Sequence, residues 1–359
     1  MKARLGLTAL PFIAITWTAP VLAEPDHAAV NRVLADAVIM PAYEKYHQAM
    51  QALVPAIDAL CDKPGDQTLA ASQDAFEESV DAWQRLQPIA FGPIEDQAIA
   101  ARIHFWPDKH GTAGKQLSKL LAKPDPAALE NGVAGKSAAL QSLAALERVL
   151  FDHADKITTA DGTFACTLAS AVATYQSDLA GDVLKAWQGD GGHYALFTNA
   201  TDGNDAYYDP ADAATDLFGA LAATLDGIVA NKLERPLGKS LEGAKPKRAE
   251  DWRSARSLAN ITANLETIEA LYIEDGGLHV WLSVQGQDGL DQTLRNGLTQ
   301  TLDTADAIDL PLFEAVGSET ERQKVEQLLQ GVISLRALFT GTLADAADLT
   351  IGFNKSDGD

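Results

Sequence analysis

The chain has 359 residues, of which 47% are hydrophobic and 22% charged, a balance typical of folded globular proteins and unlike that of disordered chains. It carries 28 basic against 50 acidic residues, a formal charge of −22. Such a charge disfavours binding to nucleic-acid phosphates unless a local basic patch exists. The densest basic stretch, Lys245, Lys247 and Arg248, is followed at once by Glu250 and Asp251. The sequence therefore predicts no such patch and no nucleic-acid partner.

The first 23 residues have the features of an export signal. A positively charged start and an apolar run from Leu5 to Trp17 precede Val21-Leu22-Ala23, the small-residue pattern that signal peptidase requires. We expect cleavage after Ala23 and a mature chain in the periplasm or cell envelope. A membrane anchor is the alternative, but Pro11 and Pro20 interrupt the short apolar region. No other stretch approaches the ~18–20 apolar residues that a membrane span needs, so we predict no integral membrane span.

The next features along the chain are helices, because apolar residues recur with helical spacing. Segments with this spacing include Val30–Met40, Tyr43–Leu60, Phe76–Gln87, Leu217–Lys232, Leu258–Tyr272 and Val325–Leu343. Pro41 is expected to kink or restart the first of them. Strand-like alternation is nearly absent, apart from a weak segment at His279–Val284 that could as well be helical. Long helices with short connections predict an all-α fold of two packed antiparallel helical bundles.

Two irregular stretches interrupt this pattern. Gln188–Asp209 is rich in glycine and asparagine. It predicts an N-terminal bundle over residues 24–190, a linker over 191–204 and a C-terminal bundle over 205–359. The second stretch, Ile89–Gly114, interrupts the first bundle. Both are longer than a turn between helices needs, which favours a functional role.

The chain has only two cysteines, Cys61 and Cys166. Exported proteins fold in oxidising surroundings, so a pair with no third competitor is expected to form one disulfide. Two unpaired buried thiols are the alternative. Two cysteines are also too few for a cysteine-based zinc framework.

A short segment within Ile89–Gly114 concentrates residues that can carry chemistry: Arg102, His104, Trp106 and Asp108. Loops that combine aromatic and polar side chains are typical of pocket walls. A loop anchored to the bundle by its aromatic side chains is the alternative. The sequence has no glycine-rich phosphate loop, no His-Glu-x-x-His zinc signature and no nucleophile elbow.

Glu147 lies on the same helical face as Leu143, Leu146 and Leu150, within an apolar stripe. Burying an unpaired carboxylate is costly, so it must be paired, protonated or bound to a ligand. A salt bridge to an arginine of a neighbouring helix and a role in binding would both meet this requirement.

Arg253 and Arg256 lie at the start of the Leu258–Tyr272 helix, and either could reach Glu147 across a bundle interface. A solvated polar face explains the same residues. We predict that one cavity gathers the candidate ligand-binding residues Glu147, Arg102, His104, Trp106 and Asp108, with Arg253 and Arg256 approaching from the second bundle.

Several segments in chain order carry a family resemblance. They are Ala90–Ile94, Arg102–Asp108, Leu146–Phe151, Leu233–Gly238, Trp252–Ser254 and the ending Gly352–Asp359. Together they resemble the imelysin-like family, whose founding members were described as peptidases. The resemblance implies two packed helical bundles with a site near their interface, a bacterial cell-envelope location and a link with iron-regulated uptake.

The family signature is Gly-x-His-x-x-Glu, and this chain departs from it. The matching segment runs from Ser142 to Glu147, with Ser142 at the glycine and Ala144 at the histidine. Alanine can neither coordinate a metal nor transfer a proton, which argues against peptidase activity by the family's route. The resemblance therefore implies an exported protein that binds a small ligand or metal without catalysis.

The sequence does not identify the ligand. One candidate cofactor is a divalent metal or iron, held by Glu147 and His104. Two other functions stay open: a metallopeptidase that uses Glu147 with a displaced histidine, and a docking partner of an envelope uptake complex.

Overall fold

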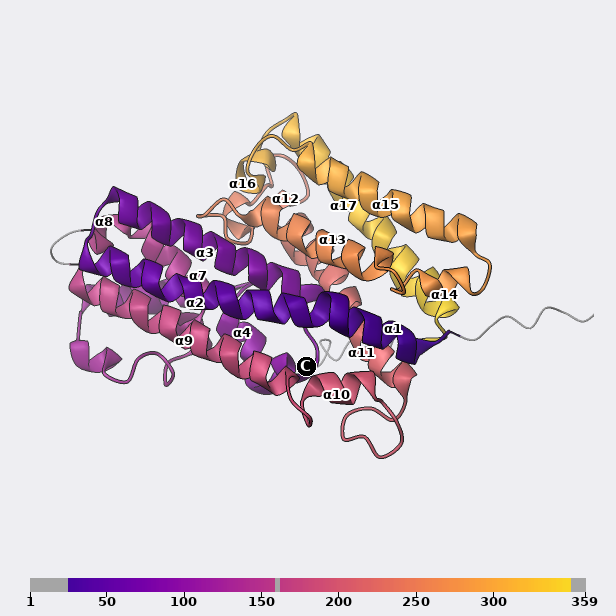
Figure 1. Ribbon diagram of the computed structural model, residues 1–359. Coiled ribbons are helices and arrows are strands. Elements are labelled where there is room, and N and C mark those ends of the chain that lie inside the picture. The colour runs from indigo at the N-terminus through magenta and orange to yellow at the C-terminus, as the bar shows by residue number, and fades with distance from the viewer. Residues whose placement is uncertain (1–24, 159–161, 350–359) are drawn as a thin grey trace, which may run out of the picture.

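The computed structural model describes residues 25–158 and 162–349. Over these two ranges the regular structure is helical and no strand occurs, which confirms the all-α prediction (Figure 1). The proposed signal, residues 1–23, and the ending Gly352–Asp359 lie outside the described residues. Export and cleavage after Ala23 therefore stay predictions.

The α-helices of the first half are α1 (His27–Leu34), α2 (Met40–Asp62), α3 (Asp66–Leu86), α4 (Ile99–Ile103), α5 (Thr112–Ala122), α6 (Ala138–Gln141), α7 (Leu143–Glu147), α8 (Ala154–Ile157) and α9 (Thr163–Trp187). Those of the second half are α10 (His193–Thr198), α11 (Pro210–Gly227), α12 (Arg235–Leu237), α13 (Ser257–Ile273), α14 (Val280–Ser283), α15 (Asp288–Asp306), α16 (Leu312–Ala315), α17 (Glu321–Ala337) and α18 (Ala344–Ala346). Short 3₁₀ segments occur at Gln87–Ile89, Gly92–Ala98, Pro126–Leu129 and Pro246–Arg248.

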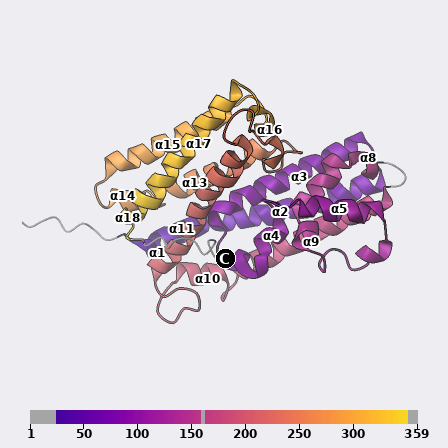
Figure 2. The ribbon, with the colours of Figure 1, turned by 180° about the vertical axis from the view of Figure 1, so that it is seen from behind.

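The N-terminal bundle is built on three long helices, α2, α3 and α9, with the shorter α5 beside them (Figure 2). The short helices α6 and α7 pack between α5 and α9. The apolar stripe of α2 buries Tyr43, Tyr46 and Leu53 against the other two. A disulfide joins Cys61, near the end of α2, to Cys166, near the start of α9, with Cα atoms 5.5 Å apart. This confirms the predicted pairing and shows that α2 runs antiparallel to α9.

The C-terminal bundle consists of α11, α13, α15 and α17. Its α13 packs on both α15 and α3, so this helix connects the two bundles (Figure 1). Among the described residues one helical stretch, Pro210–Leu237, is long and apolar enough to cross a membrane by length and composition. Of its most apolar window 56% is buried in the protein, as in the core helix of a bundle.

The stretch predicted as a linker contains helix α10, which packs against α1. Its His193 and Phe197 meet the rings of Phe91, Trp187 and Tyr207 at centroid distances of 4.7–6.5 Å. Residues of both bundles share one continuous apolar core. The boundaries at 191–204 stay a prediction, but this segment is folded onto the protein.

Two local expectations can be compared with the structure. The helical alternative holds for His279–Val284, because Val280–Ser283 forms α14. Near Pro41 a new α-helix begins, because Ala35–Ile39 is π-helical and α2 starts at Met40. Proline removes a hydrogen-bond donor and crowds the preceding turn, and a wider turn relieves that conflict.

A π-helical segment that precedes a proline also occurs next to the candidate site. Ile228–Glu234 is π-helical and ends two residues before Pro236. A further π-helical segment, Arg148–Asp152, directly follows Glu147. Such segments are frequent at functional sites.

Candidate functional site

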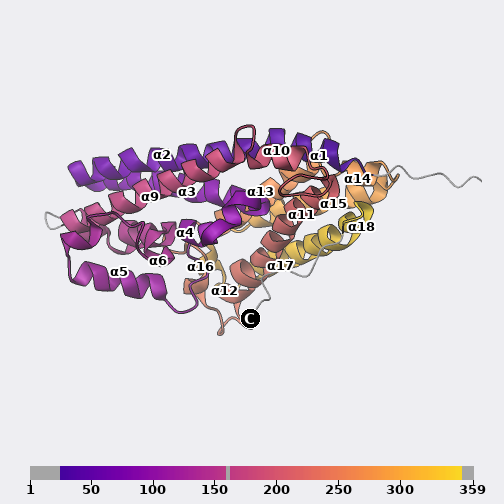
Figure 3. The ribbon, with the colours of Figure 1, turned by 90° about the horizontal axis from the view of Figure 1, so that it is seen from below.

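A pocket of about 90 Å³ lies between the two bundles and is lined by residues of both. Figure 3 shows α12 beside the segments around α4 and α5. The N-terminal bundle contributes Phe105, Trp106, Asp108, Ala144, Glu147 and Arg148 to its lining. The C-terminal bundle contributes Arg235, Lys247, Arg248, Asp251, Trp252 and Arg253.

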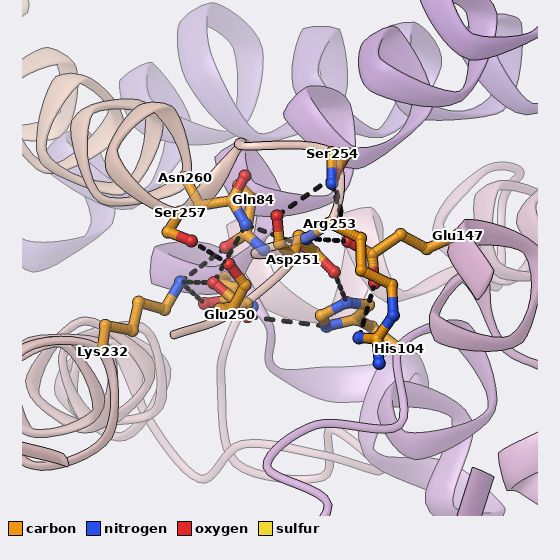
Figure 4. A network of polar contacts seen from close by, with 11 residues as sticks. Gln84, His104, Glu147, Lys232, Glu250, Asp251, Arg253, Ser254, Ser257 and Asn260 are labelled. Carbon is orange, nitrogen blue, oxygen red and sulfur yellow. Dashed lines mark hydrogen bonds and ion pairs between the residues drawn. The ribbon is translucent and has the colours of Figure 1, made fainter. Parts of the chain in front are cut away.

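Behind the pocket lies a buried group of four charged residues, His104, Lys232, Glu250 and Asp251, which we term the inner cluster (Figure 4). His104 Nε2 is 2.8 Å from Asp251 Oδ1, and its Nδ1 is 3.5 Å from Glu250 Oε1. Lys232 Nζ is 2.9 Å from Glu250 Oε2. Two adjacent carboxylates thus face two basic side chains that come from distant parts of the chain.

Amide side chains surround the ammonium group of Lys232. It donates to Gln84 Oε1 at 2.6 Å, to Asn264 Oδ1 at 2.6 Å and to Gln87 Oε1 at 3.0 Å. An ammonium group has three protons to donate, and burial without such partners would be costly. Together with Glu250, these acceptors allow Lys232 to stay buried.

The loop before α13 holds both acids of the inner cluster in place. Asp251 has a φ of +44°, which is uncommon for a residue other than glycine. Asn260, one turn into α13, donates to Glu250 Oε2 at 3.1 Å and to Asp251 Oδ2 at 2.8 Å. Ser257 Oγ donates to the Glu250 carbonyl. The first turns of α13 therefore fix a strained loop conformation that points both carboxylates inward.

Charge pairing sets the protonation of the inner cluster. Burial alone would lower the pKa of His104, but the charge and hydrogen bond of Asp251, with the charge of Glu250, raise it to about 9. Burial would raise the pKa of Asp251, but His104 and Asn260 outweigh it and lower that pKa. At neutral pH His104 is therefore an imidazolium paired with a carboxylate.

Glu147 is 3% exposed and interacts with the same loop from the other side. Its Oε1 accepts hydrogen bonds from the Arg253 backbone N–H, the Ser254 backbone N–H and Ser254 Oγ, all at 3.1 Å. Its Oε2 lies 3.6 Å from Arg253 Nη1. Burial and the charge of Asp251 raise the pKa of Glu147 to about 7, although Arg253 and Ser254 oppose the shift. The carboxyl group thus titrates near neutral pH at the pocket wall.

The structure places most, but not all, of the predicted site residues together. Glu147, Trp106, Asp108 and Arg253 line the pocket. His104 lies behind it, and among the described residues no hydrogen bond or ion pair joins it to Glu147. Asp251 instead lies between them, paired with His104 and lining the pocket.

Two of the predicted arginines lie elsewhere. Arg256 pairs with Glu77 and Asp81 of α3, at 3.7 and 3.4 Å. Arg102 does not line the pocket, and its carbonyl accepts a hydrogen bond from Gln176 Nε2 at 2.7 Å. Neither side chain lines the cavity, so the expected position of these two arginines is wrong. Arg256 directly precedes α13, which packs on α3, and its guanidinium group pairs with acids of that helix.

Sequence reasoning missed Lys232, Glu250 and Asp251. A signal existed for Lys232, because it occupies the position of an apolar residue in the Leu217–Lys232 periodicity, as Glu147 does in its own helix. The two acids follow a basic stretch, and the sequence does not reveal that they turn inward.

One nitrogen and two carboxylate oxygens of His104, Glu250 and Asp251 lie within 4.8 Å of one another. These donor types suit a divalent transition metal. However, both nitrogens of His104 face carboxylates, and Lys232 contacts Glu250. The residues fit a metal only after His104 loses its proton, since metal ligation requires neutral imidazole.

The fold and site define an all-helical protein of two packed bundles, with a charged pocket and a buried ion cluster where the bundles meet. The sequence model of the Imelysin family matches residues 39–339, and the chain belongs to this family. No protein among those with curated descriptions matches.

Two solved structures share the fold. An imelysin-like protein from Psychrobacter arcticum 273-4 has a TM-score of 0.77 and 20% identity, over 93% of this chain and 100% of that one. An iron-regulated protein A precursor from Parabacteroides distasonis ATCC 8503 has a TM-score of 0.76 and 17% identity, over 90% of this chain and 96% of that one.

Proposed function

We propose that this chain is an exported cell-envelope protein that binds a small ligand or metal at the bundle junction, without catalysis, in the service of iron uptake. The pocket is the observation that supports this proposal. It brings Glu147 and Ala144, the positions of the family signature, to the same wall as Asp251 and Arg253. A concave site with a few convergent charged groups is the usual form of a small-ligand site.

Export is supported by two features of different kinds. The sequence begins with a signal-like segment, and the Cys61–Cys166 disulfide is of a type that persists in oxidising compartments. The link with iron comes from the family and from the name of the Parabacteroides distasonis protein, an iron-regulated precursor.

Binding without catalysis is favoured by what the pocket offers. Ala144 has no group that could ligate a metal or move a proton. The nearest imidazole, His104, is held between Asp251 and Glu250 behind the pocket. A general base must reach the proton that it abstracts, and this geometry gives His104 no open face.

A metallopeptidase is the second candidate, and one observation favours it. The ligand atoms of His104, Glu250 and Asp251 lie within 4.8 Å of one another, and the pKa of the neighbouring Glu147 is raised to about 7. A carboxylate with such a pKa is suited to general-base catalysis near neutral pH.

Metal content and proteolysis of the purified mature chain separate the two candidates. We expect the chain to bind iron, supplied either as a salt or as a citrate complex, in a titration followed by elemental analysis, and to leave casein intact with every divalent metal added. Glu147→Gln should weaken binding, whereas Glu319→Gln, an exposed change outside the pocket, should not. Casein cleavage that disappears in Glu147→Gln would establish the peptidase instead, and retention of the chain in the cytoplasm would refute export.

A further inference from the structure

Three basic side chains of the pocket lack acidic partners. In the parts of the chain that the structure describes, the side chains of Arg235, Lys247 and Arg248 make no hydrogen bond or ion pair. Lys247 Nζ lies 5.2 Å from the ring of Trp252, a cation–π contact that leaves its protons free. In a chain of net charge −22, three unpaired cations in one pocket are unexpected on composition alone.

The acids of the same pocket are already engaged. Asp108 accepts from the backbone N–H groups of Thr112 and Ala113, at 2.8 and 2.9 Å, and so satisfies the free donors at the start of α5. Glu147 is engaged by Arg253 and Ser254, and Asp251 by His104. The charge of Asp108 also acts on Arg235, but among the described residues none of the three acids forms an ion pair with Arg235, Lys247 or Arg248.

The basic groups of the pocket also act on one another. Burial and the nearby charge of Arg253 lower the pKa of Arg148, although Asp152, Glu147 and Asp108 oppose the shift. Burial and the charge of Arg248 lower the pKa of Arg235, although Asp108 opposes it. Like charges held close together are stabilised by an incoming anion.

We propose that the pocket binds a small oxyanion, the carboxylate or phosphate group of a small ligand, through Arg235, Lys247 and Arg248. The guanidinium fork suits both groups, because it offers two parallel N–H donors to two oxygens. About 90 Å³ is room for a few heavy atoms, since roughly 10–15 Å³ on this measure holds one water. This inference rests on the proposed function only in taking the pocket as the ligand site.

The oxyanion has two sources that share this chemistry. It is either a free anion or the anionic group of a complex that carries iron. A positively charged pocket repels aquated iron but attracts iron wrapped in carboxylates, so the inference assigns recognition to the anionic part of the ligand.

Calorimetric titration of the full mature chain at low ionic strength tests the inference. The probes are inorganic phosphate, citrate, ferric citrate and an aquated iron salt, each added separately. The variant is Arg235→Gln/Arg248→Gln, which removes two unpaired guanidinium groups and leaves every described ion pair intact. The matched control is Lys63→Gln/Lys185→Gln, which removes the same charge from exposed positions outside the pocket.

We expect at least one of the three anionic probes to bind, with an affinity about tenfold or more weaker in the arginine variant and unchanged in the control. Binding of phosphate or citrate alone identifies a free anion, and binding of ferric citrate alone identifies the complex. The inference is overturned if no anion binds, or if both double variants weaken binding equally. Binding of aquated iron without any anion overturns the inference and leaves the proposed function standing, whereas no binding of any probe overturns both.

Discussion

The inner cluster and the pocket in front of it contain the same types of side chain but differ in how their charges are balanced. In the cluster, His104 and Lys232 face Glu250 and Asp251, and each charge has a partner within 3.5 Å. In the pocket, basic side chains outnumber the acids, and each acid already has hydrogen-bond or ion-pair partners. Paired buried charges fix a structure, whereas unpaired charges at a cavity attract a ligand.

One loop serves both regions. Residues 247 and 248 present their basic side chains to the pocket, and residues 250 and 251 present their carboxylates to the cluster. The cluster therefore orients the loop that carries part of the pocket. Substitutions within the cluster should affect stability first, and those at the pocket should affect binding first.

The largest effect is expected when the same type of substitution, lysine to methionine, is made separately in each region and the two variants are compared. Lys232→Met leaves Glu250 buried without its ammonium partner, which typically costs about 3–5 kcal/mol of unfolding free energy. Lys247→Met removes an exposed cation and should change stability by no more than about 0.5 kcal/mol. Urea unfolding measures both. Equal losses in the two variants would contradict the contrast between the regions.

The next effect is a pH dependence carried by His104. Its pKa in the folded chain is about 9, above the ordinary value of 6.5, because Asp251 and Glu250 outweigh the effect of burial. A base with a raised pKa stabilises the fold fully below pH 6.5, and this contribution is lost as the pH rises through 9. The loss should amount to about 3 kcal/mol in urea unfolding.

His104→Gln supplies the comparison, because glutamine does not titrate. The difference between wild type and variant should change between pH 6.5 and 9 and be constant below that window. A difference that does not vary between pH 6.5 and 9 would show that the pKa of His104 is not raised in the folded chain.

Glu147 should make the unfolding free energy depend on pH in a lower range than His104 does. Burial and the charge of Asp251 raise its pKa from 4.5 to about 7. An acid with a raised pKa destabilises the fold once it ionises, so its cost develops as the pH rises from 4.5 to 7. Relative to wild type, Glu147→Gln should gain about 3 kcal/mol across that window, measured by urea unfolding at pH 4.5 and 8.

Ligand titration of the same variant decides what Glu147 does. If its carboxylate only holds the loop at Ser254, binding should be unchanged. Lost binding with an intact melting temperature would make it part of the ligand site.

Periodicity was sufficient to predict the helices and the burial of Glu147. The apolar residues of α13 and α17 recur every three or four positions, so their buried faces follow from the sequence. The same argument would have identified Lys232, because it too occupies an apolar position. The disulfide followed from the number of cysteines and the signal-like start.

The pocket could not be predicted in the same way. Adjacent basic and acidic residues in the sequence suggest that their charges cancel, but Asp251 and Glu250 pair with His104 and Lys232 instead of with Lys247 and Arg248. Their direction depends on a positive φ at Asp251 and on hydrogen bonds to α13. Arg235 joins them from α12, and contacts of this kind depend on tertiary packing that helical spacing does not encode.

The smallest effect concerns two arginines three residues apart, which the sequence treats alike. Arg253 lies over the ring of Trp252, with its Cζ 4.4 Å from the centroid, and contacts Glu147 and Asp152. Arg256 forms partly exposed pairs with Glu77 and Asp81.

Pairs of the second kind contribute about 0–1 kcal/mol, because water screens them and ordering two long side chains costs entropy. Arg256→Gln should therefore lower unfolding free energy by less than about 1 kcal/mol and leave ligand binding unchanged. Arg253→Gln should weaken binding, because it removes a cation from the pocket wall and frees Glu147 Oε2 to oppose the ligand's charge. Parallel urea unfolding and ligand titration of the two variants measure the difference. If Arg256→Gln weakens binding as much as Arg253→Gln, the charges that matter extend beyond the pocket, and recognition is a property of the whole bundle junction.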